Sequence, residues 1–165
     1  MNRLLRHLLF PDWLTRRRFP GSTLQRIEAA VAASERGHTG ELRFAVEGAL
    51  HPAQLMAGMT ARERALEVFS SLRIWDTAAN NGVLIYLLLA EHAIEIVADR
   101  GLARRVPAER WQAIVAGMRE QFRAGQYEAG LGAAIDAVDA LLTQHFPLAV
   151  GAIDTDELSN VPLVI

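Results

Sequence analysis

Residues 80–102 read NNGVLIYLLLAEHAIEIVADRGL, and this stretch decides the fold of the 165-residue chain. Residues 82–89 are apolar on both faces and follow a cluster of turn residues, which is typical of a central strand covered on both sides. Residues 93–99 alternate between the two faces, a pattern that indicates a second strand. Because only about three residues around Glu91 separate the two segments, we expect an antiparallel hairpin.

The residues before this hairpin predict one more strand and a crossover helix. Residues 41–47 (ELRFAVE) alternate between apolar and polar side chains, which indicates a half-exposed strand. Thr60 and Glu63 have the spacing of a capping box and predict a helix from there to about residue 72. Since this helix lies between the first two strands, we expect those strands to be parallel, with a right-handed crossover.

Further helices are expected on either side of this unit. Ser22 and Gln25 also have capping-box spacing and precede an apolar stripe that runs to about residue 36. Apolar stripes predict two more helices, over residues 107–124 and 127–145. This order of elements predicts an α/β fold, a single-domain α/β/α sandwich with a small mixed sheet flanked by helices. We assign it to residues 21–147, between an N-terminal arm (1–20) and an irregular C-terminal tail (148–165).

The composition is that of one globular domain and excludes several chemistries. Hydrophobic residues make up 51% of the chain and charged residues 22%, which is ordinary for a folded domain. The chain has no cysteine, so thiol catalysis and cysteine-ligated zinc or iron–sulfur clusters are excluded. All 17 basic residues are arginine, which we attribute to codon bias.

The charge of the chain, −2 in total, is unevenly distributed. Residues 1–26 hold six arginines and one acid, a net charge of +5, so the remainder carries −7. The arm is also apolar, and spacings of three and four place Leu5, Leu8 and Leu9 on one face of a short helix that Pro11 limits. Two interpretations stay open, a solvated terminal segment and a contact surface for a partner. The predicted contact residues are Arg3, Leu5, Arg6, Leu9, Trp13, Arg16, Arg17 and Arg18.

The expected partner is a protein or a membrane surface. No secretory signal is recognisable, and the longest apolar run, residues 83–90, is far shorter than the roughly 20 residues that span a bilayer. We therefore expect a cytoplasmic protein, peripheral at the membrane if the arm binds lipid. The chain is slightly acidic and lacks a nucleic-acid-binding motif, so no nucleic-acid partner is expected.

One group of polar residues could carry chemistry. The sequence has no nucleophile elbow, no phosphate-binding loop and no histidine pair with metal-ligand spacing, so these motifs leave any catalytic residue unknown. The hairpin, however, should bring the residues before its first strand close to those after its second. Oxygen ligands there would suit Ca²⁺ or Mg²⁺, the only cofactors expected, and Arg100 could bind an anion bidentately. The predicted metal ligands are Asp76, Asn80, Asn81 and Asp99, with Glu95 and Glu41 as further acids.

A simpler interpretation of these residues also stays open. Aspartate and asparagine are common in turns, and Asp99 would cap the turn that contains Gly101. Asp99 and Arg100 would then form no more than a local charge pair.

With these elements in place, the chain resembles the TPM-domain family, in the manner of a short bacterial member. The resemblance rests on the strand start at residues 81–84, the turn at residues 99–102 and a helix break at Phe122, Gly125, Tyr127 and Gly130. It implies an α/β/α sandwich, and it also implies divalent-cation binding, acid phosphatase activity or assembly roles, as in various members. Many members have an Asp-x-Ala-Gly-type motif before the first helix, where this chain has no acid (residues 19–24, FPGSTL).

Two functions follow from these observations. The first is a non-catalytic accessory or interaction domain that binds a divalent cation and a protein or membrane partner. The alternative is a metal-dependent, acid-phosphatase-like hydrolase. In that case Asp76 and Asp99 would hold the ion against a phosphoryl oxygen, and Arg100 would stabilise the developing charge.

Overall fold

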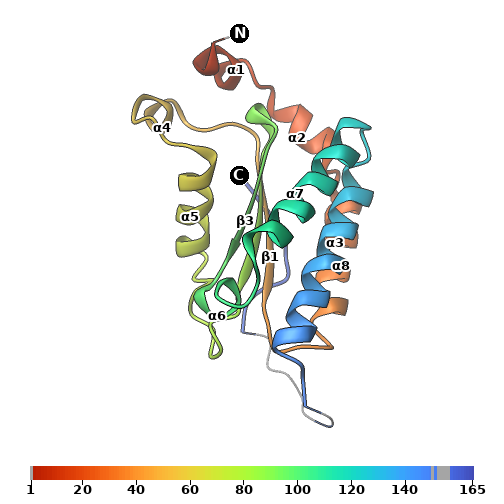
Figure 1. The fold of residues 1–165 in the computed structure, drawn as a ribbon. Helices are drawn as coiled ribbons and strands as arrows, with labels where there is room; N and C mark the ends of the chain where they lie inside the picture. The colour runs from red at the N-terminus through yellow and green to blue at the C-terminus, as the bar shows by residue number, and fades with distance from the viewer. Residues whose placement is uncertain (1, 150, 152–156) are drawn as a thin grey trace.

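A four-stranded mixed sheet lies at the centre of the molecule (Figure 1). The computed structural model describes residues 2–149, 151 and 157–165. The strands are β1 (Leu42–Glu47), β2 (Val83–Leu88), β3 (Ala93–Ala98) and β4 (Leu163–Val164), in the spatial order β3-β2-β1-β4. Every residue of β1 and β2 is buried. This confirms the prediction for β2, whereas the prediction of a half-exposed strand at residues 41–47 is wrong, because the sheet is covered on both faces.

The pairing of the first three strands confirms the sequence prediction. β1 and β2 are parallel, in a register that pairs Leu42 with Val83, and β2 and β3 form an antiparallel hairpin. The short 3₁₀ helix η1 (Leu89–Glu91) makes the hairpin turn and ends at His92. The tail, predicted to be irregular, instead adds β4 in parallel to β1. The unpaired backbone groups of an edge strand such as β1 can pair with a short segment whatever the side-chain pattern of that segment. The side-chain pattern of the tail therefore did not predict β4.

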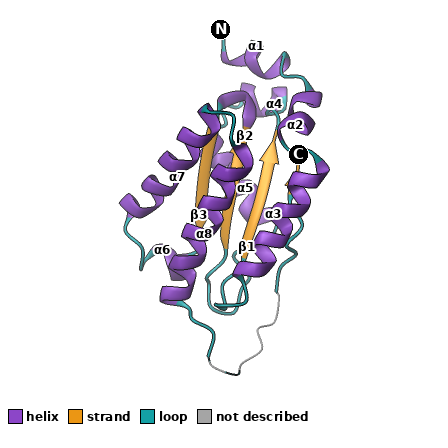
Figure 2. Ribbon diagram, turned by 90° about the vertical axis from the view of Figure 1, so that its right-hand side faces the viewer, coloured by secondary structure: helices purple, strands orange, loops and turns teal. Residues whose placement is uncertain are grey.

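Helices cover both faces of the sheet (Figures 1 and 2). One face carries α5 (Ala61–Ser71), and the other carries α3 (Gly21–Ser34), α7 (Ala108–Arg123) and α8 (Tyr127–His145). Both hydrogen bonds of the predicted capping box between Thr60 and Glu63 are present at the start of α5. The capping box predicted at Ser22 is wrong, because α3 begins at Gly21 after Pro20 and has no side-chain cap.

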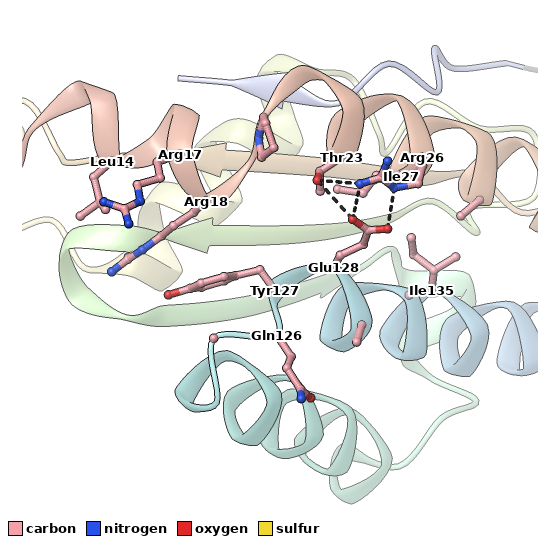
Figure 3. A pocket seen from close by; sticks show the side chains of 15 residues that line it. Leu14, Arg17, Arg18, Thr23, Arg26, Ile27, Gln126, Tyr127, Glu128 and Ile135 are labelled. Atoms are coloured by element: carbon pink, nitrogen blue, oxygen red, sulfur yellow. Dashed lines mark hydrogen bonds and ion pairs between the residues drawn. The ribbon is translucent and has the colours of Figure 1, made fainter.

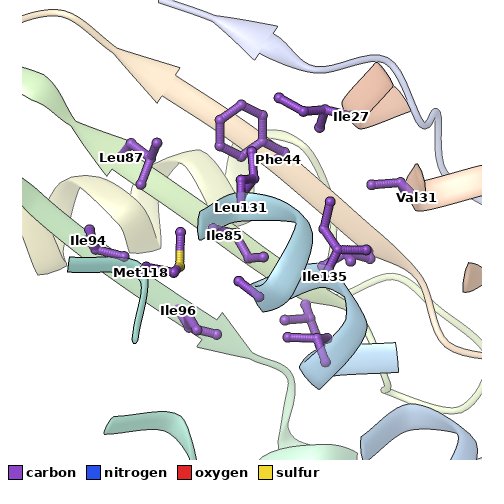
Figure 4. Packing of buried hydrophobic residues seen from close by; sticks show 14 of the residues in the cluster. Ile27, Val31, Phe44, Ile85, Leu87, Ile94, Ile96, Met118, Leu131 and Ile135 are labelled. Carbon is purple, nitrogen blue, oxygen red and sulfur yellow. The ribbon is translucent and has the colours of Figure 1, made fainter. Parts of the chain in front are cut away.

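Two apolar clusters hold these layers together. Alternate residues of β2 enter opposite clusters, because successive side chains of a strand point to opposite faces. Ile85 and Leu87 pack under α3, α7 and α8, and Figure 4 shows them with Phe44, Met118 and Leu131.

The smaller cluster lies between the sheet and α5, and it includes one polar network. The Tyr86 hydroxyl donates to Glu47 Oε2 at 2.7 Å, and Arg64 Nε donates to the same oxygen at 2.8 Å. Burial, followed by the charge of Glu47, raises the pKa of Tyr86. This network fixes α5 on the sheet and leaves Tyr86 as a hydrogen-bond donor.

Four short helices complete the described chain: α1 (Arg3–Leu8), α2 (Asp12–Arg18), α4 (Pro52–Met56) and α6 (Arg100–Ala103). As predicted, the first helix ends before Pro11; α2 begins immediately after this proline. The short helix α4 begins with a capping box that His51 and Gln54 form. Among the described residues, no helix is long and apolar enough to cross a bilayer.

The N-terminal arm packs against the rest of the molecule. Phe19 lies in the larger apolar cluster, 2% exposed, and the side chains of His7 and Thr15 are also buried. A Cβ atom at Gly48 would lie 2.9 Å from Thr15 Oγ1, which shows how closely α2 approaches the end of β1. The packing of the domain therefore continues across residue 20.

Candidate functional site

The sheet edge where β1 and β2 begin and β3 ends gathers buried polar side chains. The backbone N–H of Val83 donates to Glu41 O, and that of Asp99 donates to Gly82 O, both at 2.8 Å. These bonds align the ends of three strands at one level. Glu41, Asn81 and Asp99 are all buried there, at 1%, 0% and 8% exposure.

Asn81 is held firmly but leaves one oxygen without a partner. Its Nδ2 atom donates to Thr39 O at 2.9 Å, and its backbone N–H donates to Thr77 Oγ1 at 3.1 Å. Its Oδ1 atom is buried and has no hydrogen-bond partner among the described residues. Leaving a buried acceptor unsatisfied costs roughly 1–3 kcal/mol, so this oxygen is available to a ligand at little further cost.

Asp99 has the same property. Its Oδ1 atom accepts from the backbone N–H of Arg100 at 2.7 Å and so caps α6. Its Oδ2 atom is buried and, within the described part of the chain, accepts no hydrogen bond. The turn role that the sequence left open is therefore real, but it uses only one of the two carboxylate oxygens.

Asn80 and Arg100 are brought into direct contact beside these two residues. Arg100 donates to Asn80 Oδ1 through Nε at 2.9 Å and through Nη2 at 2.7 Å. Asn80 has a left-handed backbone, with φ of 52°, and its carbonyl oxygen accepts from the backbone N–H of Gly101 at 2.9 Å. A Cβ atom at Gly101 would lie 2.4 Å from that carbonyl, so this close approach requires glycine. Because Asn80 occupies two donors of Arg100, bidentate anion binding through them requires this contact to open.

Two of the predicted acids lie apart from this group. Asp76 is exposed and forms an ion pair with Arg73. Glu95 lies in the middle of β3, opposite Tyr86, and 3.5 Å from Arg62 Nη1. Across the described residues, no cluster of three or more His, Cys, Asp or Glu side chains could hold a metal ion.

Glu157 also lies at this edge, and no sequence pattern predicted that it would. Its backbone N–H donates to Glu41 Oε1 at 2.9 Å, and its carboxylate accepts from the backbone N–H of Ala78. The oxygen atoms that could coordinate a metal ion at this edge are thus Asn81 Oδ1 and Asp99 Oδ2, with the carboxylates of Glu41 and Glu157 close by.

A second buried polar cluster lies at the opposite end of the sheet, and sequence reasoning missed it. His7 Nε2 is 2.8 Å from Glu91 Oε1, and the backbone N–H of Leu50 donates to His7 Nδ1 at 3.0 Å. Since Nδ1 accepts, the proton lies on Nε2. Arg3 donates to the same Glu91 oxygen at 2.6 Å and also to Met59 O. The spacing of Arg3 and His7, four residues apart on one helix, was the available signal.

This cluster ties α1 to the body of the protein. Burial opposes ionisation of Glu91, but the hydrogen bonds from His7 and Arg3 outweigh it and lower the pKa of that carboxyl. The side-chain nitrogens of His7 are both engaged, which is the pattern of a structural contact.

The outer face of the arm carries exposed apolar side chains. Exposure is 48% for Leu5, 68% for Leu9 and 59% for Trp13. Arg16 and Arg17 are exposed, and the Arg17 guanidinium lies 6.0 Å from the centre of the Trp13 ring. Of the other predicted contact residues, Arg3 is bound to Glu91, and Arg6 and Arg18 are half-buried.

A groove of about 1080 Å³ runs between the α2–α3 segment and the start of α8 (Figure 3). Arg26 donates to both carboxylate oxygens of Glu128 at 2.6 Å, and Thr23 also donates to that carboxylate. Arg26 and Glu128 therefore neutralise each other, and Arg17 and Arg18 are the other charged residues that line the groove. Arg18 lies over the ring of Tyr127, 5.3 Å from its centre.

Comparison with known proteins identifies relatives of this chain. The model of the TPM domain matches residues 17–141. The NMR structure of the BA42 protein from the psychrophilic bacterium Bizionia argentinensis is 26% identical, with a TM-score of 0.75 over 87% of this chain and 92% of that chain. The N-terminal domain of a protein from P. gingivalis is 17% identical, with a TM-score of 0.59 over 79% of this chain and 82% of that one. Among curated proteins, none matches.

Proposed function

The chain belongs to the TPM-domain family, and from this premise we propose that it is a non-catalytic interaction domain that binds a divalent cation at the edge formed by Asn81 and Asp99. One observation carries the proposal. Two oxygens, Asn81 Oδ1 and Asp99 Oδ2, are buried without a partner among the described residues, at adjacent ends of paired strands. A bound cation would supply the missing partner of a buried oxygen of this kind.

The chemistry of these donors favours Ca²⁺ over Mg²⁺. Ca²⁺ accepts amide, backbone and carboxylate oxygens in flexible geometry, whereas Mg²⁺ demands a near-ideal octahedron and retains several waters. Asp99 supplies negative charge, and the carboxylates of Glu41 and Glu157 increase it nearby. The backbone around Asn81 is fixed by its bonds to Thr39 and Thr77, so one donor would be organised before the ion binds.

The same contacts favour binding over hydrolysis. The hydroxyls of Thr39 and Thr77 both accept hydrogen bonds from Asn81, and among the described residues no base is hydrogen-bonded to either hydroxyl. The hydrolase alternative needs Asp76 on the metal and Arg100 on a phosphoryl group. Asp76 is engaged by Arg73, and Arg100 by Asn80.

Calorimetric titration of the full chain with Ca²⁺, and separately with Mg²⁺, tests the cation site. We expect wild type to bind Ca²⁺ more tightly than Mg²⁺, and Asp99→Asn to weaken Ca²⁺ binding at least tenfold. Asp136→Asn, which removes an exposed carboxylate on α8, is the matched control and should bind like wild type. Asp76→Asn separates the two functions, because only the hydrolase arrangement uses that carboxylate. If wild type does not bind either metal at millimolar concentration, the proposal is wrong.

The interaction surface in this proposal is the outer face of α1 and α2. Its exposed leucines and Trp13 lie beside Arg16 and Arg17, a combination that suits the surface of an anionic membrane. We expect the full chain to float with vesicles that contain anionic lipid, and Leu9→Glu or Trp13→Glu to reduce flotation several-fold. Leu66→Glu, at an exposed position of α5, is the control. Absence of flotation, or equal flotation of all variants, rejects membrane contact.

A further inference from the structure

A second cavity, of about 810 Å³, lies at the end of the sheet opposite the candidate cation site. It is bounded by the end of β2, the hairpin turn, the last turns of α7 and the start of α8. Leu87, Leu89, Ile94 and Phe122 give it an apolar lining. Its volume is within the range of roughly 300–1,000 Å³ that is usual for small-molecule sites.

Half of the polar residues that line this cavity are arginines. Arg18 comes from α2, and Arg119 and Arg123 come from α7. In the described part of the chain, none of these three arginines forms an ion pair. Glu91 is the single acid among the described lining residues, and its carboxylate is engaged by Arg3 and His7.

The hairpin turn places a histidine in the same positive field. His92 has a left-handed backbone, with φ of 52°, a conformation in which a residue other than glycine is strained. Burial lowers the pKa of His92, and the charges of Arg18 and Arg6 lower it further. Arg18 and His92 therefore share one region of the cavity, and an anion bound there would offset the positive charge of Arg18.

The neighbouring groove of Figure 3 provides an internal comparison. Arg18 and Tyr127 line both hollows, but the groove contains Glu128, which binds Arg26 with two hydrogen bonds. Among the described residues, no carboxylate forms an ion pair with Arg119 or Arg123. Both hollows therefore carry excess positive charge, but only the cavity has no arginine paired with a carboxylate among its described lining residues.

We propose that this cavity binds an amphipathic organic anion, with a carboxylate or phosphate head against Arg18, Arg119 and Arg123 and an apolar body against the side chains of the sheet. Tight binding requires both the anionic head and the apolar body of the ligand. Arg119 and Arg123 are exposed and hold a small inorganic anion weakly, because water screens exposed charges. The apolar lining adds affinity in proportion to the surface that the ligand buries.

The test uses the full chain without divalent metal, so that its outcome is independent of the cation site. The probes are octyl phosphate and octanoate, below the concentration at which they form micelles. Inorganic phosphate has the head alone, and octyltrimethylammonium has the same body with the opposite charge. Calorimetry measures affinity, and NMR follows the ring signals of His92 with pH. We expect both amphipathic anions to bind, at least tenfold more tightly than the other two probes, and to raise the pKa of His92.

Variants distinguish the cavity from the other surfaces. Arg123→Gln should weaken octyl phosphate binding about five- to tenfold, whereas Arg110→Gln, on the same helix but outside the cavity, should have no effect. Leu9→Glu alters the exposed face of the arm and should also bind like wild type.

Three results would overturn the proposal. Equal binding of inorganic phosphate would mean a site for a free anion, and equal binding of the ammonium probe would mean non-specific apolar contact. Unchanged His92 signals at saturation would place the ligand elsewhere.

Discussion

The two ends of the central sheet bury polar side chains in different ways. At the upper end of Figure 1, Glu91 and both ring nitrogens of His7 have partners. At the other end, Asn81 and Asp99 each leave one buried oxygen without a partner among the described residues. A buried polar group with all of its partners contributes to stability, whereas one that lacks a partner indicates a place for a ligand. This difference is why we assign the cation site to the second end.

Replacement of His7 tests the structural end and has the largest expected effect. His7→Leu leaves the buried N–H of Leu50 without an acceptor and Glu91 with one partner fewer. We expect the free energy of unfolding to fall by about 3 kcal/mol, near the upper limit for an unsatisfied buried donor. Urea unfolding at neutral pH measures this. A change below about 1 kcal/mol would show that α1 contributes little to the fold.

The close backbone approach at the other end should be almost as sensitive. Gly101→Ala would bring a methyl group to within 2.4 Å of Asn80 O and 2.7 Å of Ala79 O. We expect a loss of about 2 kcal/mol, as for other overpacked positions, together with weaker Ca²⁺ binding. Gly117→Ala is the control, because no atom lies within 4 Å of its added methyl group. It should stabilise α7 by about 0.5 kcal/mol. Similar thermal unfolding of both variants would contradict the assigned constraint.

Acid should weaken the His7–Glu91 end in a defined window. The pKa of Glu91 is lower in the folded than in the unfolded protein, so its contribution is complete above an unfolded pKa of about 4.3 and is lost as the pH falls through the folded pKa. We expect a loss of about 1.5 kcal/mol, typical of a hydrogen bond to a charged group. Urea unfolding of wild type and Glu91→Gln between pH 3 and 7 measures it. Their difference should shrink below pH 4, and a constant difference would refute the assignment.

The smallest effect on stability is expected at Asp99. Asparagine is as good a helix cap as aspartate, and the lost carboxylate oxygen has no partner among the described residues. Without metal, Asp99→Asn should therefore change the free energy of unfolding by less than about 0.5 kcal/mol. With Ca²⁺ at 100 times its dissociation constant, wild type should gain about 2.7 kcal/mol and the variant much less. Equal gains for both proteins would show that Asp99 is not a ligand.

Much of the fold could be predicted from the sequence. The alternation in residues 41–47 and 93–99, and the continuous apolar run between them, predicted three strands with the correct pairing. The chain therefore has the fold that its resemblance to the TPM-domain family implied. The contact of Asn80 with Arg100 also followed, because an antiparallel hairpin must bring its two ends together.

Other features were decided only by the tertiary structure. β4, the contact of Glu157 with Glu41, and the clamp between His7 and Glu91 join residues that are far apart in the chain. A local sequence pattern shows the period of a strand or helix, because that period relates each residue to its near neighbours in the chain. Whether a buried oxygen finds a partner depends on which distant segment packs beside it. The sequence by itself thus determined the hairpin and its polar ends. The packing of the remote segments decided that His7 and Glu91 have hydrogen-bond partners at one end, whereas Asn81 Oδ1 and Asp99 Oδ2 have none among the described residues at the other.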